Sequence, residues 1–212
     1  MVAATGSRWV VEPGRRTEFV GAVRKAKSII EPLGASVQLR QTWSGGENAG
    51  QLTLVLVFDS EKKRGEVLDT LRSERLLASF GNLVDGPNSP ARLLSRVWLN
   101  EVGGPGTMPM PRNILQTLSF ALAPGQGDAG LAALEAAREK HLGMGAEPRL
   151  WRLVNAGALS GTYIYGVQFD GLSEQADFWT SGLGSGPLPL QDAVRAGVLV
   201  SIGGGFGYSI SL

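Results

Sequence analysis

The chain has 212 residues, a formal net charge of +1, no cysteine and one histidine. This composition excludes disulfides and cysteine-based metal or nucleophile sites, and the small net charge gives no long-range attraction for nucleic acid or an anionic membrane. Its 43% hydrophobic and 18% charged residues are typical of a globular protein. The N-terminus resembles no signal peptide and no apolar run approaches the length of a membrane span, so we expect a cytoplasmic protein.

In chain order, the first predicted element is a short apolar strand, "RWVVE", which ends at the turn signal Pro13-Gly14. A helix should follow, because Phe19, Val23, Ala26 and Ile30 recur at helical spacing, and glycine at position 34 should end it. Two strands come next, and the Asp-Ser pair at positions 59 and 60 can cap a second helix. The apolar stretch "LLSRVWLNEV" predicts a closing strand.

The same order of elements then repeats at an offset of 111 residues. The stretch from position 13 to position 60 aligns without a gap to the stretch from 124 to 171, with identical residues at 11 of 48 positions. Chance would give about 7% identity in a chain of this composition, so a duplication is indicated. We predict two βαββαβ repeats, one over residues 1–102 and one over residues 113–212, joined by a linker over residues 103–112.

Both faces of the third strand in each repeat are largely apolar. In the first repeat, Leu52, Leu54 and Leu56 alternate with Val55 and Val57. A strand of this kind must be covered on both sides, and we expect helices on one face and the other repeat's sheet on the second. This α+β pattern resembles the dimeric α+β barrel superfamily, with two ferredoxin-like units packed sheet against sheet in one chain.

The resemblance implies a fold but not one function. The superfamily includes cofactor-free antibiotic-biosynthesis monooxygenases, muconolactone isomerase-type enzymes, the NIPSNAP group, and haem proteins of the chlorite dismutase and dye-decolorising peroxidase types. Its members differ too much in chemistry for the fold to select among them, so the sequence leaves open whether this chain is an enzyme.

Differences between the two repeats suggest where a ligand binds. The second repeat has two tyrosines where the first has Leu52 and Leu54, and a glycine where the first has Val55. It also has a tryptophan in place of Arg40 and an arginine in place of Gln38. Such changes could supply the walls, orienting groups and space of a pocket, although each aromatic residue could equally belong to the core. The predicted substrate-binding residues in the C-terminal repeat are Arg149, Trp151, Tyr163, Tyr165, Gly166 and Trp179. A buried arginine among them would need a carboxylate or an anionic ligand.

His141 is the candidate catalytic residue because it replaces Ile30 at a core-facing helix position. A structural histidine near the helix end explains it equally well. Our leading functional prediction is binding of a small apolar or aromatic molecule without cofactor or metal, with cofactor-independent oxygenation or isomerisation if the chain is catalytic. The alternatives are haem binding through His141, implied by the resemblance, and a non-catalytic partner-binding role through an exposed patch with Phe178 and Trp179. We expect a monomer or homodimer that binds neither nucleic acid nor membrane.

Overall fold

The computed structural model describes all residues except 45, 77–87 and 185–188. The first repeat has the element order β1, α1, η1, β2, η2, β3, α2, β4, where η marks a short 3-10 helix. Its elements are β1 (Ala3–Val11), α1 (Arg16–Ile30), η1 (Glu31–Leu33), β2 (Ala35–Ser44), η2 (Gly46–Asn48), β3 (Leu52–Phe58), α2 (Glu61–Ser73) and β4 (Ala91–Glu101).

Among the described residues, the second repeat follows the same plan and has a further helix, α6, before its last strand. Its elements are β5 (Ile114–Leu122), α4 (Gly127–Gly143), β6 (Arg149–Asn155), η3 (Gly157–Leu159), β7 (Tyr163–Phe169), α5 (Leu172–Gly184), α6 (Pro189–Arg195) and β8 (Leu199–Ile210). The pairs β1 and β5, β3 and β7, and α2 and α5 begin and end at positions that differ by the same 111 residues. The structure therefore confirms the repeat.

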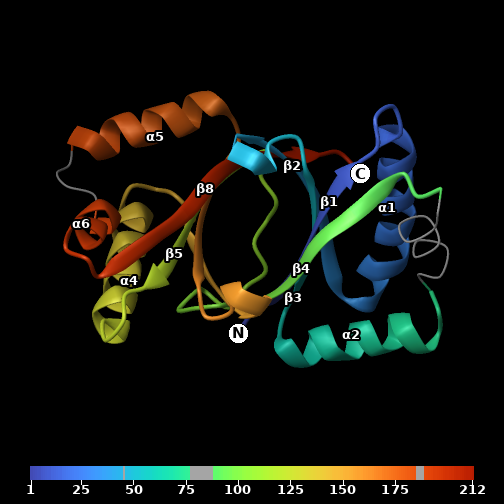
Figure 1. Cartoon of the computed structure of the whole chain (residues 1–212), viewed down its shortest axis with the longest axis horizontal. Coiled ribbons are helices and arrows are strands. Elements are labelled where there is room, and N and C mark those ends of the chain that lie inside the picture. The colour runs from blue at the N-terminus through green and yellow to red at the C-terminus, as the bar shows by residue number, and fades with distance from the viewer. Residues whose placement is uncertain (45, 77–87, 185–188) are drawn as a thin grey trace.

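Eight antiparallel strands form one closed barrel in the order β1-β3-β2-β8-β5-β7-β6-β4. Each repeat supplies a four-stranded sheet of the ferredoxin-like kind, and the pairs β2–β8 and β4–β6 join the two sheets at both edges. The helices lie outside the barrel, those of the two repeats on opposite sides (Figure 1). The expected α+β barrel within one chain is thus confirmed, and closure leaves its sheet without a free edge.

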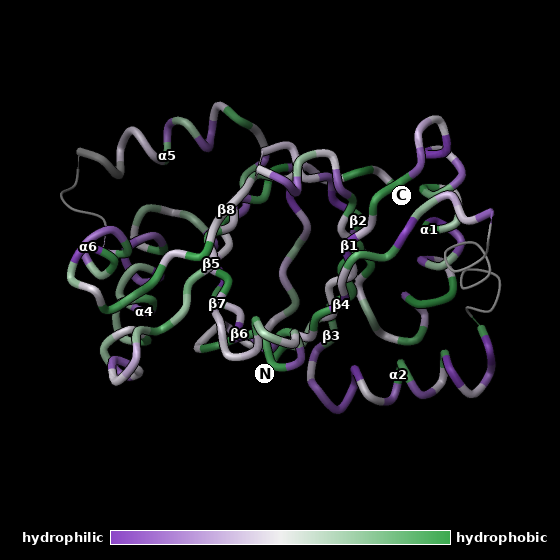
Figure 2. Tube along the Cα trace, viewed as in Figure 1, coloured by the Kyte–Doolittle hydropathy of each residue, from purple (hydrophilic) through white to green (hydrophobic). Residues whose placement is uncertain are grey.

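Two hydrophobic clusters fill the space between helices and sheets, and a third lies inside the barrel. Leu52, Leu54 and Leu56 of β3 face the helices of the first repeat. Val57 belongs instead to the interior cluster with Val2, Ala4, Leu99 and Leu153. Figure 2 shows the resulting pattern along the trace, with hydrophilic residues frequent on the outlying helix α2. The two apolar faces of β3 are covered as predicted.

The cap of α2 follows from the local sequence, whereas the lengths of β1 and β8 depend on the strands beside them. Ser60 caps α2 by accepting a hydrogen bond from the backbone N–H of Lys63, as expected. β1 begins at Ala3, five residues before the predicted "RWVVE" strand, because its small residues pair with β3 and β4 on both sides. β8 continues through the glycine run "GGGFG" because β2 and β5 supply partners there.

The segment between β4 and β5 crosses one end of the barrel (Figure 1). The carbonyl of Thr107 accepts a hydrogen bond from Arg149, and the side chain of Met108 packs against the interior cluster. At the far end of the segment, the backbone N–H of Arg112 donates to Gln168 Oε1. The predicted linker is therefore held to strands of the barrel. Among the described residues, no helix has the length and apolar character needed to cross a membrane.

Candidate functional site

The predicted site residues lie on both faces of the C-terminal sheet. Tyr163 and Tyr165 point toward the helices and belong to the helix–sheet core with Phe178. Trp179 packs on the edge of that core, where its Nε1 donates to Gln116 Oε1 at 2.6 Å. On the other face, Trp151 packs against the cluster inside the barrel. The structure therefore does not gather the predicted residues around one cavity.

His141 lies in the helix–sheet layer of the second repeat and is only 2% exposed. Its Nδ1 is 2.6 Å from the hydroxyl of Tyr165, which also donates to the carbonyl of Ala137. Burial lowers the pKa of His141 to about 4, with a smaller contribution from Lys140, and burial raises the pKa of Tyr165 above its ordinary value. At neutral pH this pair is uncharged, and because the single hydroxyl proton goes to Ala137, the Nδ1–H of His141 donates to the hydroxyl oxygen.

The surroundings of His141 do not fit a haem ligand. Its Nε2 is buried without a hydrogen-bond partner, which would suit a metal ligand. However, the rings of Tyr165, Phe178 and Trp179 contact the imidazole with centroids 5.6, 5.2 and 5.5 Å away. A porphyrin at Nε2 would have to displace part of this aromatic packing. The same packing leaves Phe178 only 8% exposed, so the expected exposed patch with Trp179 is not present.

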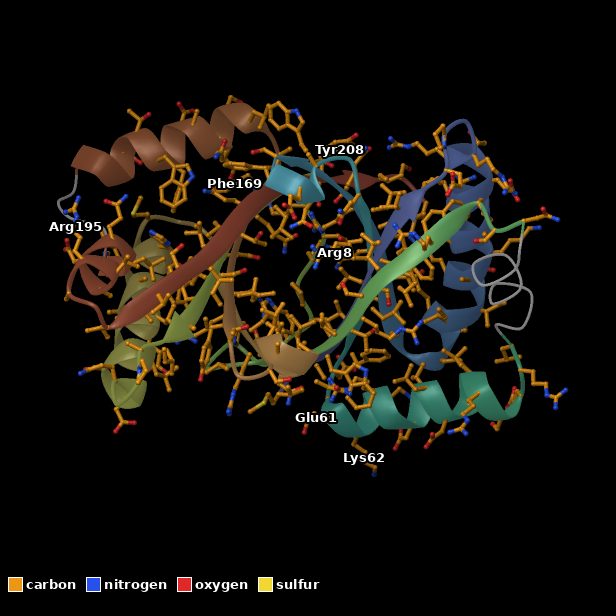
Figure 3. All side chains as sticks on the ribbon, viewed as in Figure 1. Arg8, Glu61, Lys62, Phe169, Arg195 and Tyr208 are labelled. Carbon is orange, nitrogen blue, oxygen red and sulfur yellow. The ribbon has the colours of Figure 1, made fainter. Side chains whose placement is uncertain are left out.

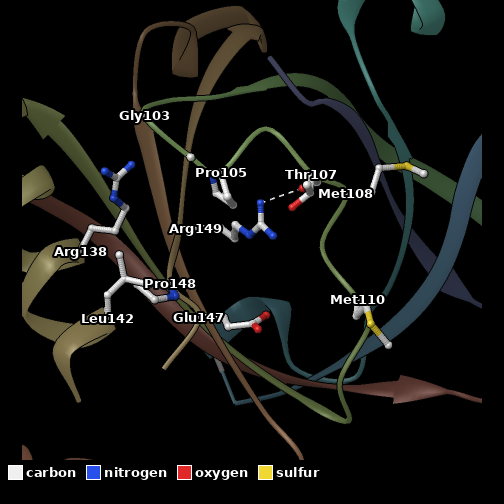
Figure 4. A pocket seen from close by; sticks show the side chains of 11 residues that line it. Gly103, Pro105, Thr107, Met108, Met110, Arg138, Leu142, Glu147, Pro148 and Arg149 are labelled. Carbon is white, nitrogen blue, oxygen red and sulfur yellow. Dashed lines mark hydrogen bonds between the residues drawn. The ribbon is translucent and has the colours of Figure 1, made fainter. Parts of the chain in front are cut away.

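Arg149 lies at the start of β6, where it lines a cavity of about 660 Å³ between the linker and α4 (Figure 4). Its Nη1 is 2.6 Å from Glu101 Oε1 and 2.9 Å from the carbonyl of Thr107. Both side chains of the ion pair are almost fully buried, so the arginine has the carboxylate that its burial requires. A second arginine on this wall, Arg138, pairs with Glu139. Both arginines of this cavity therefore already have a carboxylate partner within the protein.

A second cavity, of about 370 Å³, lies inside the barrel and is lined by all eight strands. The wall formed by the C-terminal repeat is mainly apolar or glycine, and includes Leu115, Ile164 and Gly203. The wall formed by the N-terminal repeat contributes two arginines, Arg8 and Arg40. Gly166 faces inward beside this cavity, where a Cβ would lie 3.4 Å from Leu115 Cδ1. The charged groups of the cavity thus come from the N-terminal repeat, whereas the predicted binding residues all lie in the C-terminal repeat.

Arg40 is the unusual residue of this cavity, because it is 4% exposed and lacks an acidic partner among the described residues. Its Nη2 donates to Gln168 Oε1 at 2.6 Å and to Gln38 Oε1 at 3.2 Å, and its Nη1 donates to the carbonyl of Arg112 at 3.2 Å. All these acceptors are neutral. Burial lowers the pKa of Arg40 to about 10, which still leaves the guanidinium charged at neutral pH.

Sequence reasoning singled out position 40 only as the counterpart of Trp151 and did not select the arginine itself. The strand alternation carries a usable signal, since Gln38, Arg40 and Thr42 alternate with the apolar Val37 and Leu39 of β2. In a barrel whose helices cover the apolar face, those polar residues must point inward. The partners of Arg40 could not be found this way, because Gln168 lies 128 residues away.

No protein-family model matches the sequence, and no curated protein matches it. Solved structures that share its fold include a candidate chlorite dismutase (TM-score 0.59, 10% identity, covering 99% of this chain and 95% of that chain). A candidate monooxygenase from Fusobacterium nucleatum is also similar (TM-score 0.60, 7% identity, coverage 98% and 91%). So is a haem-binding protein from Thermus thermophilus (TM-score 0.56, 10% identity, coverage 99% and 91%). The chain has the fold of the dimeric α+β barrel proteins, and identities this low extend no further than the fold.

Proposed function

We propose that the interior of the barrel binds a small organic anion with an apolar or aromatic body. The observation that carries this proposal is the buried guanidinium of Arg40 on the cavity wall, which has only neutral hydrogen-bond acceptors among the described residues. A buried cation without a counter-ion is costly by several kcal/mol, and an anionic ligand would remove that cost. Arg149 is also buried, but its counter-ion, Glu101, belongs to the protein itself.

Within the cavity, the described lining residues restrict the chemistry. They provide arginines and hydroxyl groups such as Thr53 and Thr117, but no carboxylate, histidine or tyrosine that could act as a general base. A substrate must therefore bind as an anion, or lose its proton to water when it pairs with Arg40. Such pairing lowers the pKa of a bound phenol or enolisable ketone and stabilises the anion.

This environment fits cofactor-independent oxygenation better than isomerisation. An electron-rich phenolate or enolate can itself supply the electrons to dioxygen, whereas an isomerase must also return a proton to a second carbon. The described cavity offers no carboxylate or imidazole for that second transfer. The similarity to a candidate monooxygenase supports the same choice. The haem alternative receives support from a haem-binding structural neighbour, but the packing around His141 argues against that residue as the ligand.

The proposal is tested by titrating the wild-type protein and an Arg40→Gln variant with 2-naphthoate, a fluorescent aromatic carboxylate. Removing a charged hydrogen-bond donor should weaken binding about tenfold or more. Arg152→Gln is the matched control, because Arg152 is exposed and lines neither cavity, and its affinity should be unchanged. Arg40→Lys keeps the charge and should bind with intermediate affinity. No binding by the wild type, or equal binding by a folded Arg40→Gln variant, would refute the proposal.

A further inference from the structure

The cavity contains a second cation, Arg8, placed in the same transverse row of the barrel as Arg40. Arg8 pairs directly with Thr53 of β3, and Thr53 pairs in turn with Arg40 of β2. On the other side of Arg8, the row continues to Ser95 of β4. Directly paired residues on neighbouring strands share a face, and all four residues line the interior cavity. The row therefore places two cations on one wall, separated by a hydroxyl-bearing strand.

The two guanidinium groups are held toward different ends of the cavity. Arg40 donates to Gln168 and to the carbonyl of Arg112, next to the segment that crosses the barrel end. Arg8 donates to Asn48 Oδ1 at 2.5 Å, in the connection between β2 and β3. Figure 3 shows the side chain of Arg8 within the outline of the barrel. Two strand spacings put the Cα atoms of the arginines about 10 Å apart, and the hydrogen bonds hold their guanidinium groups on different partners rather than on a common point.

The charge of the cavity is not balanced by the protein. Neither arginine has an ion-pair partner among the described residues, and the lining residues include no acid. The rest of the lining includes Val55 on the same wall and Leu115 and Ile164 on the opposite wall, which suit an apolar ring system. The site therefore offers two separate anion-binding positions that face an apolar wall.

We infer that the ligand is a flat aromatic compound with an acidic group at each of two opposite edges, one bound by Arg40 and the other by Arg8. This inference rests on the proposed function, because it assigns a second role within the same cavity. Arg40 binds the acidic group at the end of the cavity near Arg112, and Arg8 binds the acidic group at the end near Asn48. The hydrogen bond to Asn48 positions the guanidinium of Arg8 before the ligand binds. A monoacid would leave the Arg8 position unused.

The test compares naphthalene-2,6-dicarboxylate with 2-naphthoate, since the two probes share a ring system and differ by the second carboxylate. Wild-type protein should bind the dicarboxylate about tenfold or more tightly than the monoacid. Arg8→Gln should remove most of this preference, because it should weaken the binding of the dicarboxylate far more than that of 2-naphthoate. Arg40→Gln should weaken the binding of both probes, and Arg152→Gln should weaken neither. Thermal unfolding of each variant checks that the fold is retained.

The possible outcomes separate the two claims. If 2-naphthoate binds in an Arg40-dependent way but the dicarboxylate binds no better, the proposed function stands and the two-anchor inference is wrong. The inference is equally wrong if the dicarboxylate preference survives in Arg8→Gln. If neither probe binds to the wild-type protein, both claims fail. A preference lost in Arg8→Gln and kept in Arg152→Gln would support the inference.

Discussion

Replacing Glu101 by glutamine should destabilise the protein strongly, because it leaves the charge of Arg149 buried and unpaired. The side chains of Arg149 and Glu101 are 9% and 2% exposed, and their closest atoms are 2.6 Å apart. Breaking such a pair on one side costs about 3–5 kcal/mol. We expect the lower end, about 3 kcal/mol, because the glutamine oxygen can still accept and the carbonyl of Thr107 keeps its hydrogen bond. That loss is a large part of the typical stability of a folded domain, about 5–15 kcal/mol.

Urea unfolding at neutral pH, followed by tryptophan fluorescence, measures this loss directly. Glu139→Gln is the matched control, since it breaks the more exposed pair with Arg138 and should cost less than about 1 kcal/mol. The double variant Glu101→Leu with Arg149→Met removes both charges, and it should recover most of the stability lost in the single variant. A Glu101→Gln variant within about 1 kcal/mol of wild type, or a double variant no better than the single one, would contradict this account.

The buried aromatic cluster around His141 leads to three further predictions. The folded protein holds the pKa of His141 near 4. The stability gained by keeping this histidine neutral is therefore complete above about pH 6.5 and is lost as pH falls toward 4, by up to about 3 kcal/mol. His141→Gln should remove that part of the pH dependence in urea unfolding, and it is a clean test because the chain has one histidine. Tyr165→Phe should cost about 1–3 kcal/mol, since it leaves His141 Nδ1 without a hydrogen-bond partner, and an unchanged unfolding midpoint would disprove the assigned hydrogen bond. Haem titration should give the same absorption spectrum for wild type and His141→Gln, and a Soret band lost only in the variant would show that the aromatic packing opens to admit haem.

The fold could be predicted because the repeat and the strand patterns agree with each other. Glycines 34 and 145 both have positive φ angles, of 99° and 82°. Gly34 caps η1, which continues α1, and Gly145 follows the cap residue of α4, so both lie close to the helix ends that the sequence indicated. The apolar alternation of β3 correctly indicated cover on both faces. The extent of β8 was not predictable, because its glycines carry no strand signal and the barrel supplies partners from both sides. Pairing with β2 and β5 in the closed barrel, rather than local strand propensity, therefore determines the extent of β8.

The candidate site was less predictable, since it depends on which strand face points inward and on distant partners. Tyr163 and Tyr165 suggested pocket walls, yet their odd-numbered positions on β7 face the helices. The inward positions of the same strand hold Ile164, Gly166 and Gln168. Whether a buried arginine is paired also cannot be read from sequence spacing, as Glu101 lies 48 residues from Arg149. Arg40 could be recognised as exceptional only after its neutral surroundings were known.

The contrast between the two buried arginines can be tested by giving Arg40 a carboxylate of its own. Gln168 Oε1 lies 2.6 Å from Arg40 Nη2, so Gln168→Glu would place an anion beside this guanidinium with little change in shape. If the site is kept uncompensated for a ligand, the variant should be at least as stable as wild type in urea and should bind 2-naphthoate about tenfold more weakly. Gln38→Glu is a useful companion, because Gln38 contacts the same Nη2 at the longer distance of 3.2 Å and should have a smaller effect. Unchanged binding in a stable Gln168→Glu variant would mean that the charge of Arg40 is not what attracts the ligand.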